Sequence, residues 1–128
     1  MNSLIIDAAR NVIFLTLIFD KNIYTSRHEN SKINFEKMTI LISDLLETNK
    51  CSLNKINTIY VNGGPGSFAG IRNSLATIKA IFLTKNIDYY CFSPSDFGDM
   101  DQIKHKDIPD LCEKFKIKKN LINPIYLS

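Results

Sequence analysis

Apolar residues in the first part of the chain cluster in short runs separated by polar, turn-forming positions. The first two runs flank the turn Ala9-Arg10-Asn11 and therefore predict a β-hairpin, which a third run continues. Two later runs, each shorter than a typical helix, predict further strands. The predicted strands cover residues 3–8, 11–19, 22–28, 59–61 and 87–92.

Two segments, residues 34–49 and 67–85, show the 3.6-residue period of a helix instead. In the first, the apolar residues fall within about 140° of one another at 100° per residue. These residues are Phe35, Met38, Leu41, Ile42, Leu45 and Leu46. The second segment is apolar around most of its circumference, so we expect it to be covered on more than one face. The residues expected to face the sheet are Phe68, Ile71, Leu75, Ile78 and Phe82, with Ile81 and Leu83 at the flanks.

The order of these elements predicts an α/β fold. Three hairpin strands followed by helix, strand, helix and strand give a mixed five-stranded sheet, antiparallel on one side and parallel on the other. This is the topology of a single ribonuclease-H-like domain, which is also one lobe of the actin-like ATPases. Beyond Pro94 the pattern weakens; residues 107–116 predict a short helix with Pro109 in its first turn, and residues 122–127 an extended end.

A glycine-rich segment, Asn62-Gly63-Gly64-Pro65-Gly66-Ser67, lies between a predicted strand and a predicted helix. It interrupts both kinds of structure, and Ser67 is placed to cap the helix. A loop in this position has two interpretations, a tight turn or a phosphate site made of backbone amides. The spacing matches neither a P-loop nor the GxGxxG dinucleotide motif. The candidate loop residues are Gly63, Gly64, Pro65, Gly66, Ser67, Gly70 and Arg72.

Small residues form a stripe along the second predicted helix. Ala69, Asn73, Ala76 and Ala80 are spaced 4, 3 and 4 apart, and small side chains let another helix approach closely. Two occupants are open: the chain's own helix 34–49, or a helix of a partner chain. We call these four residues the seam. Together with Phe35 and Met38 they are the predicted partner interface.

The residues that support common catalytic chemistries are absent or isolated. His28 and His105 have no metal-ligand neighbours at suitable spacing and read as lone surface histidines. A two-metal nuclease needs several carboxylates, whereas only Asp7 ends a central strand and we expect it to cap a turn. The next core strand ends in Asn62, and Glu36 is alone on its helix. We predict no catalytic residue, no metal and no cofactor.

Composition adds little beyond this. The chain has 128 residues, which is one domain's worth, and a net charge of +3. The one dense basic cluster is either a solvated helix end or a weak contact with RNA or phosphate; its members are Lys114, Lys116, Lys118 and Lys119. Three cysteines without CxxC spacing predict reduced thiols. No apolar run reaches the length of a membrane span and no signal peptide is seen, so we expect a cytoplasmic protein without membrane contact.

One stretch carries a specific family resemblance. Gly64-Pro65-Gly66-Ser67-Phe68-Ala69-Gly70-Ile71-Arg72 resembles the GPGSFTGLR signature of the TsaB (YeaZ) family, with Ala for Thr and Ile for Leu. The beginning, Leu4-Ile5-Ile6-Asp7, is similar to the first strand of that family. The end, Pro124-Ile125-Tyr126-Leu127-Ser128, is similar to its closing PxYLR, with Ser for Arg. Asn34 stands where the family's first helix opens with His, and Ser93 where the family has a serine after the fifth strand.

The resemblance implies a non-catalytic partner subunit in the formation of threonylcarbamoyladenosine at position 37 of tRNAs. The family pairs through two helices of its first lobe with TsaD, the catalytic homologue, so tRNA is reached only indirectly. TsaD carries a metal-binding histidine pair where this chain has Cys91-Phe92-Ser93-Pro94-Ser95. Family members have two lobes. Here we expect residues 1–95 to form one lobe, and residues 96–128 to be an extension in place of the second, packed on the same domain.

Two other functions remain open at this stage. The chain is alternatively a stand-alone nucleotide- or phosphate-binding domain that uses the glycine loop. A homodimer through the same two helices is the third possibility, and the sequence does not separate it from the heterodimer.

Overall fold

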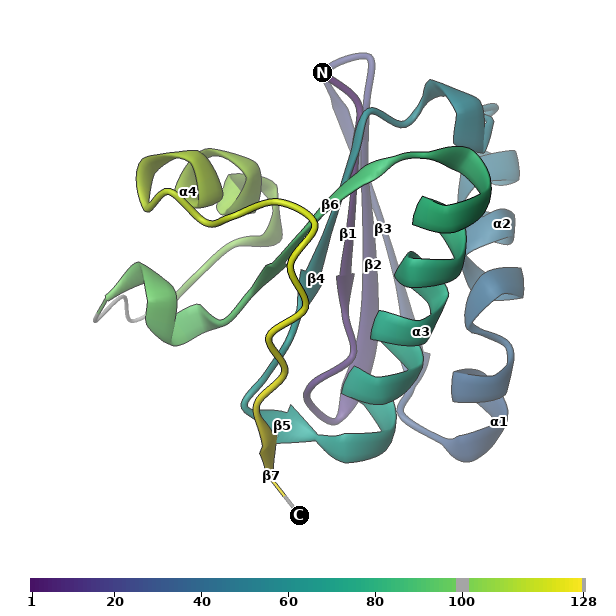
Figure 1. The fold of residues 1–128 in the computed structure, drawn as a ribbon. Helices are drawn as coiled ribbons and strands as arrows, with labels where there is room; N and C mark the ends of the chain where they lie inside the picture. The colour runs from purple at the N-terminus through teal and green to yellow at the C-terminus, as the bar shows by residue number, and fades with distance from the viewer. Residues whose placement is uncertain (99–101, 128) are drawn as a thin grey trace.

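The computed structural model describes residues 1–98 and 102–127, the last two through their backbone alone. The chain forms a five-stranded sheet in the order β3-β2-β1-β4-β6 with helices on both faces (Figure 1). Strands β1 and β2 and strands β2 and β3 pair antiparallel, whereas β4 pairs parallel with both β1 and β6. The predicted mixed sheet is therefore confirmed. The strands are β1 (Ser3–Asp7), β2 (Val12–Phe19), β3 (Asn22–Glu29), β4 (Thr58–Asn62), β5 (Gly66–Ser67), β6 (Asp88–Phe92) and β7 (Tyr126–Leu127).

The α-helices are divided between the two faces of the sheet. The α-helices are α1 (Lys32–Glu36), α2 (Met38–Thr48), α3 (Phe68–Lys85) and α4 (Ile108–Lys114). Short 3-10 helices are η1 (Leu53–Lys55), η2 (Pro94–Phe97) and η3 (His105–Asp107). Helices α1, α2 and α3 cover one face, and α4 lies on the other (Figure 1). The layer order is therefore helix, sheet, helix.

The hairpin of β2 and β3 turns at Asp20 and Lys21, which have φ angles of 50° and 67°. Two central residues with positive φ are the mark of a type I′ turn, whose twist matches that of the flanking strands. The turn sets the register, which places Phe19 opposite Asn22 and Thr16 opposite Thr25. The side chains of β2 that face α2 enter the core, whereas β3 is exposed at alternate positions because it is an edge strand.

The predicted helix 34–49 is in fact two helices, and this part of the prediction is wrong. Ser31 caps α1 by accepting a hydrogen bond from the Asn34 amide at 3.3 Å. The helix stops at Lys37, whose backbone angles of −97° and 12° leave the helical region, and α2 begins at once. Phe35 and Met38 are buried on either side of the break. The apolar period runs through the break undisturbed, so the sequence pattern did not show it.

Two hydrophobic cores flank the sheet. The larger lies between the sheet and helices α1, α2 and α3. The smaller lies on the opposite face, where Phe97, Ile108 and Cys112 pack against side chains of strands β1, β4 and β6. Those strand residues are Ile5, Tyr60 and Phe92. The described segment beyond Phe92 therefore returns to the sheet and covers a face that would otherwise be open to water.

Helix α3 buries one stripe rather than most of its circumference. Its buried residues are Gly70, Ile71, Ser74, Leu75, Ile78 and Ile81. Phe68 was expected to face the sheet but is 49% exposed, and Leu83 is 71% exposed. At 100° per residue Phe68 lies about 100° from the centre of the buried stripe, so its ring points past the sheet. The helix begins after Ser67, which accepts a hydrogen bond from the Gly70 amide at 3.2 Å and so acts as the predicted cap.

The chain end runs along the glycine-rich loop. Strand β7 pairs in parallel with β5, placing Tyr126 opposite Gly66 (Figure 1). The predicted extended end is thus a short strand, and Ser128, the last residue of the family resemblance, lies outside the described residues.

Helix α3 approaches the turn between β1 and β2 closely at Gly70. A Cβ atom added there would lie 1.8 Å from the carbonyl oxygen of Ala8. We predict that Gly70→Ala lowers the free energy of unfolding by about 1–3 kcal/mol, because backbone atoms must move apart to admit the methyl group. Urea denaturation followed by circular dichroism measures this change.

The control is Ala80→Gly, a substitution at an exposed position on the same helix. Only helix propensity changes there, so the free energy of unfolding should fall by about 1 kcal/mol. Helix propensity alone would make the Gly70→Ala variant more stable than the wild type, because alanine is favoured over glycine in a helix. A neutral or stabilised Gly70→Ala variant would therefore contradict the close approach.

Candidate functional site

Polar residues meet at the carboxyl ends of the two central parallel strands. Asp7 ends β1 and Asn62 ends β4, and both side chains are buried. The Asn62 side-chain amide donates to Asp7 Oδ1 at 3.1 Å, and the Ala9 amide lies 3.4 Å from the same oxygen. Asp7 therefore holds the turn after β1, which confirms that it acts as a turn-capping residue.

The second oxygen of Asp7 binds a histidine that is distant in sequence. His105 Nε2 lies 2.8 Å from Asp7 Oδ2, and the His105 side chain is only 23% exposed. The His105 ring also packs at 5.2 Å from the Phe14 ring. The prediction of a lone surface histidine is therefore wrong for His105. No local sequence pattern indicates this pair, because its members lie 98 positions apart.

The environment of Asp7 favours its ionised form. Burial alone would raise the pKa of the Asp7 carboxyl. The hydrogen bond and charge of His105, with the hydrogen bonds from Asn62 and Ala9, outweigh burial and hold the pKa below its ordinary value. Asp7 is thus an ionised, fully coordinated carboxylate.

A cavity of about 300 Å³ opens beside this pair. Its lining includes Asp7, Arg10, Phe14, Phe92 and His105. The Asp7 carboxylate is already held by three partners, so it has little capacity left for a ligand. Among residues 1–98 and 102–127, no group of three His, Cys, Asp or Glu side chains is arranged to hold a metal ion. The pair connects the segment around η3 to the end of β1, which is a structural role.

The backbone amides of the glycine loop are largely used within the chain. Gly63 donates to Phe92 O at 2.7 Å, Gly64 to Asn62 Oδ1 at 2.8 Å, and Ser67 to Ala9 O at 2.9 Å. An amide that already has a partner offers no donor to a phosphate. These contacts favour the interpretation of the loop as a tight structural turn.

The chain itself also occupies the space next to the loop. Gly64 has a φ of 107°, and a Cβ atom there would lie 2.0 Å from the Ile125 carbonyl oxygen. Ile125 donates to Gly63 O at 2.6 Å, and the Ser93 hydroxyl donates to Gly64 O. The glycines are therefore needed where the loop meets the end of the chain. Pro65 and Arg72, the remaining candidate residues of the loop, are exposed.

The seam on α3 faces outward. Ala76 and Ala80 are exposed, and Ala69 and Asn73 are half-buried. The chain's own helices α1 and α2 therefore leave the C-terminal half of the seam open. Of the other predicted interface residues, Phe35 is 8% and Met38 1% exposed, so both are part of the chain's own core. A partner on this face would therefore contact the exposed residues around Phe35 and Met38 and not these two side chains.

Large apolar side chains are exposed on the same helical layer. Ile33 on α1 is 63% exposed and Ile40 on α2 is 56% exposed, beside Phe68 and Leu83 on α3. A groove of about 350 Å³ separates α2 from α3, with Ile42, Leu46 and Ile81 in its lining. The sequence pattern did not reveal this groove, because it depends on how far apart the two helices lie.

Two other expectations concern the cysteines and the membrane. Cys51, Cys91 and Cys112 are free thiols, as predicted, and the structure adds that all three are buried. Within the described part of the chain, no helix has the length and apolar character needed to cross a bilayer.

Comparison with known proteins gives a sequence relative and two structural neighbours. No family model matches the chain. The chain is 37% identical over 71 residues to the tRNA threonylcarbamoyladenosine biosynthesis protein TsaB of Buchnera aphidicola, a match that covers 48% of this chain and 32% of the relative. The chain thus matches about a third of the length of that curated relative.

The solved structures have the same fold. YeaZ from Pseudomonas aeruginosa, and a second structure described as an uncharacterized protein similar to peptidase YEAZ from the same organism, each superpose with a TM-score of 0.67. Sequence identity is 16% in both cases, and the match covers 72% of this chain and 43% of the other. At this identity the likeness shows the ribonuclease-H-like fold alone.

The coordination of Asp7 predicts a pH dependence of stability. Because the folded-state pKa of Asp7 is lowered, its contribution is present above the unfolded-state pKa near 3.8 and is lost as the pH falls through the folded-state value. We predict that Asp7→Asn lowers the free energy of unfolding at pH 7 by about 1–3 kcal/mol, since His105 and Asn62 lose their charged acceptor. Urea denaturation at pH 7 and at pH 3 measures both effects.

The matched control is Asp44→Asn on α2, where the carboxylate is exposed. The difference between Asp7→Asn and the wild type should shrink at pH 3, whereas Asp44→Asn should match the wild type throughout. An Asp7→Asn variant as stable as the wild type at pH 7 would show that the carboxylate contributes nothing.

Proposed function

We propose that the chain is a TsaB-like partner subunit in the formation of threonylcarbamoyladenosine on tRNA, and its similarity to TsaB over 71 residues supports this proposal. In this proposal it pairs with a TsaD-like threonylcarbamoyl transferase, which supplies the catalytic residues. The chain itself is not an enzyme and needs no cofactor. It acts in the cytoplasm, where the tRNA substrates are.

The open face of α3 is the observation that carries this proposal. Ala76 and Ala80 leave a shallow, exposed strip on the helix, and Phe68 and Leu83 add apolar area beside it. Contiguous exposed apolar side chains on a small domain mark a surface that another protein covers. The small residues allow a partner helix to approach closely, and the larger ones supply the buried area.

The two neighbouring helices extend this surface. Helices α1 and α2 lie beside α3 on the same side of the sheet, and they contribute the exposed Ile33 and Ile40 (Figure 1). Phe35 and Met38 support the surface from below, since they hold α1 and α2 against the core. A pair of partner helices packed across α1, α2 and α3 would make a helical bundle at the junction.

The division of the chain follows from this proposal. Residues 1–95 are the lobe that pairs, and residues 96–128 stand where the relatives continue into a second lobe. The nucleotide-binding alternative has less support, because the Gly63, Gly64 and Ser67 amides are already bonded within the chain.

The seam provides a direct test. We predict that Ala76→Trp abolishes co-purification with the TsaD-like protein of the same organism, because the indole holds the two helices apart. Size-exclusion chromatography with light scattering on the co-expressed proteins measures the complex. Wild type should give a one-to-one heterodimer, and the variant two separate species with an unchanged circular dichroism spectrum.

The matched control is Lys104→Trp, which introduces the same indole at an exposed position near the opposite face. It should pair like the wild type. If Ala76→Trp pairs normally, the seam is not the interface. If the wild type forms a dimer with itself and no heterodimer, the same face serves a homodimer instead.

A further inference from the structure

The two edges of the five-stranded sheet differ in how the chain covers them. Along β6, the Asn120 amide donates to Tyr89 O at 2.7 Å, and the Asn120 side-chain oxygen accepts from the Tyr89 amide at 2.9 Å. Lys119 and Tyr90 form an antiparallel bridge beside them. At the other edge, no strand in the described part of the chain pairs with the outer side of β3. The open edge of the sheet is therefore β3.

The hairpin register shows which backbone groups of β3 point outward. Phe19 and Asn22 close a two-residue turn, and such a closing pair exchanges both of its backbone hydrogen bonds. Hydrogen-bonded pairs recur at every second position, so alternate residues of β3 from Asn22 onward bond to β2. The residues between them have N–H and C=O groups that point away from β2; they are Ile23, Thr25, Arg27 and Glu29.

A side chain closes one end of this edge and confirms its direction. Asn34 Nδ2 donates to the Glu29 carbonyl oxygen at 2.7 Å, so that carbonyl points away from β2. The outward N–H and C=O groups of Ile23, Thr25 and Arg27 remain for another strand. Unpaired backbone groups in a row are a template for pairing with a further chain.

Strand β3 lacks the features that usually protect an edge. Proteins block such edges with proline, lysine or a β-bulge. Residues Asn22–Glu29 contain neither proline nor lysine, and their register with β2 is unbroken, so there is no bulge. The Arg27 guanidinium lies 5.2 Å from the centre of the Phe14 ring, on a face of the sheet and not over its edge. Nothing in the strand itself therefore opposes pairing.

A second copy of the chain fits this edge in one register. When a two-fold axis passes through Thr25, each Thr25 faces its counterpart and each Ile23 faces Arg27 of the second copy. All the outward N–H and C=O groups of these three residues then have partners in the other copy. A two-fold interface must be self-complementary in this way, because the same surface is used on both subunits.

The charges near the edge agree with the same register. It brings Lys21, in the turn, level with Glu29 of the second copy, once on each side of the axis. Both side chains are exposed, and neither forms an ion pair within the described residues. Arg27 faces the uncharged Ile23, so no like charges are directly opposite. Opposite charges across a strand pair stabilise it, and like charges destabilise it.

A groove beside β3 provides room for a side chain of the second copy. Its volume is about 350 Å³, and its lining includes Tyr24 and Ser26 of β3 with Leu41 and Leu45 of α2. In the register centred on Thr25, Tyr24 of the second copy faces Ser26, whose small side chain leaves the groove open. The tyrosine ring then covers the two leucines, and the contact is repeated by symmetry.

We propose that two copies of the chain associate through antiparallel pairing of β3, with Thr25 at the two-fold axis, and so form one continuous sheet. The backbone groups supply the hydrogen bonds, and Lys21 with Glu29 fixes the register. This surface goes beyond the proposed function, because it lies at the edge of the sheet and leaves the exposed face of α3 free for another protein.

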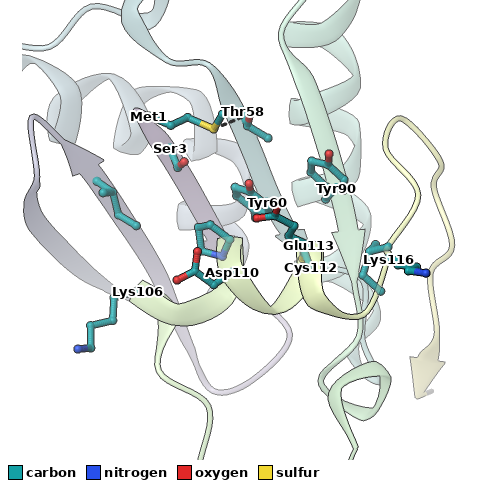
Figure 2. A pocket seen from close by; sticks show the side chains of 13 residues that line it. Met1, Ser3, Thr58, Tyr60, Tyr90, Lys106, Asp110, Cys112, Glu113 and Lys116 are labelled. Carbon is teal, nitrogen blue, oxygen red and sulfur yellow. Dashed lines mark hydrogen bonds between the residues drawn. The ribbon is translucent and has the colours of Figure 1, made fainter.

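The association also leaves the opposite face of the sheet accessible. A cavity of about 750 Å³ lies there beneath α4, with Ser3, Tyr60 and Tyr90 on its floor (Figure 2). The residues that line this large cavity come from the N-terminus, β1, β2, β4, β6 and the segment around α4. A second copy paired with β3 therefore does not fill it.

Charge reversal tests the register. Sedimentation equilibrium of the full chain over a range of concentrations measures association. We expect a dissociation constant of roughly 10–100 μM for the wild type, since a short edge buries less area than a permanent interface. Lys21→Glu and Glu29→Lys each place like charges opposite one another twice, so each should weaken association by about tenfold or more. An equimolar mixture of the two variants should associate again, because opposite charges then meet at both positions.

The matched control for charge is Lys116→Glu. Lys116 is exposed and has a φ of 54°, close to the 67° of Lys21, but it lies beside α4 and not at β3. This variant changes the net charge as Lys21→Glu does, and it should associate like the wild type.

A backbone variant tests the pairing itself. Thr25→Pro removes the outward N–H at the axis, and an edge strand accepts proline where its N–H faces solvent. Its circular dichroism spectrum should match that of the wild type, whereas self-association should be lost. The same variant should still pair with the TsaD-like protein, which separates this proposal from the one that concerns α3.

Three results would overturn the proposal. A wild type that stays monomeric at about 1 mM rules out the second copy and leaves β3 to an extended segment of another protein. A mixture of the charge variants that does not associate again shows that the register is wrong. A dimer that Ala76→Trp abolishes and Thr25→Pro does not belongs to the face of α3.

Discussion

Strand β1 is the element on which the rest of the molecule depends. All five of its residues are buried, and it pairs antiparallel with β2 on one side and parallel with β4 on the other. A strand buried on both faces requires cover on both, which α3 provides on one side and the segment around α4 on the other. Its two ends then define the two polar regions: Asp7 lies at the carboxyl end beneath the glycine loop, and Ser3 lies at the amino end on the floor of the large cavity.

The polar network at the carboxyl end of β1 joins four distant parts of the chain. Asp7 accepts from Asn62 and His105, Asn62 accepts from Gly64, and the Ser93 hydroxyl donates to the Gly64 carbonyl. Every one of these groups would be costly to bury alone, so they stabilise the fold only as a set. A glycine-rich loop and an aspartate at the end of a strand resemble an active site. Here, however, their hydrogen-bonding groups are occupied by partners within the chain.

The two faces of the sheet present different chemistry to a partner. The α1–α3 face offers small and apolar side chains, which suit a second protein. The α4 face offers the hydroxyls, carboxylates and lysines that line the large cavity. The sheet separates them, because the alternation of side chains along each strand sends neighbouring residues to opposite sides. Ile59 and Tyr60 show this directly: the first belongs to the core beneath α3, and the second to the cavity beneath α4.

Local patterns were enough to predict the strands, the position of α3, the Ser67 cap and the Pro109 start of α4, because these depend on periodicity and on single turn-forming residues. The break at Lys37 was missed, since a one-residue interruption leaves the apolar period intact. The ion pair of Asp7 and His105, the exposure of Phe68 and the cavity beneath α4 were also missed. Sequence by itself determined the approximate bounds of the main strands and helices and which positions in them are apolar. Only the tertiary structure decided which apolar sides are covered and which polar groups meet, because both depend on packing between segments that are far apart along the chain.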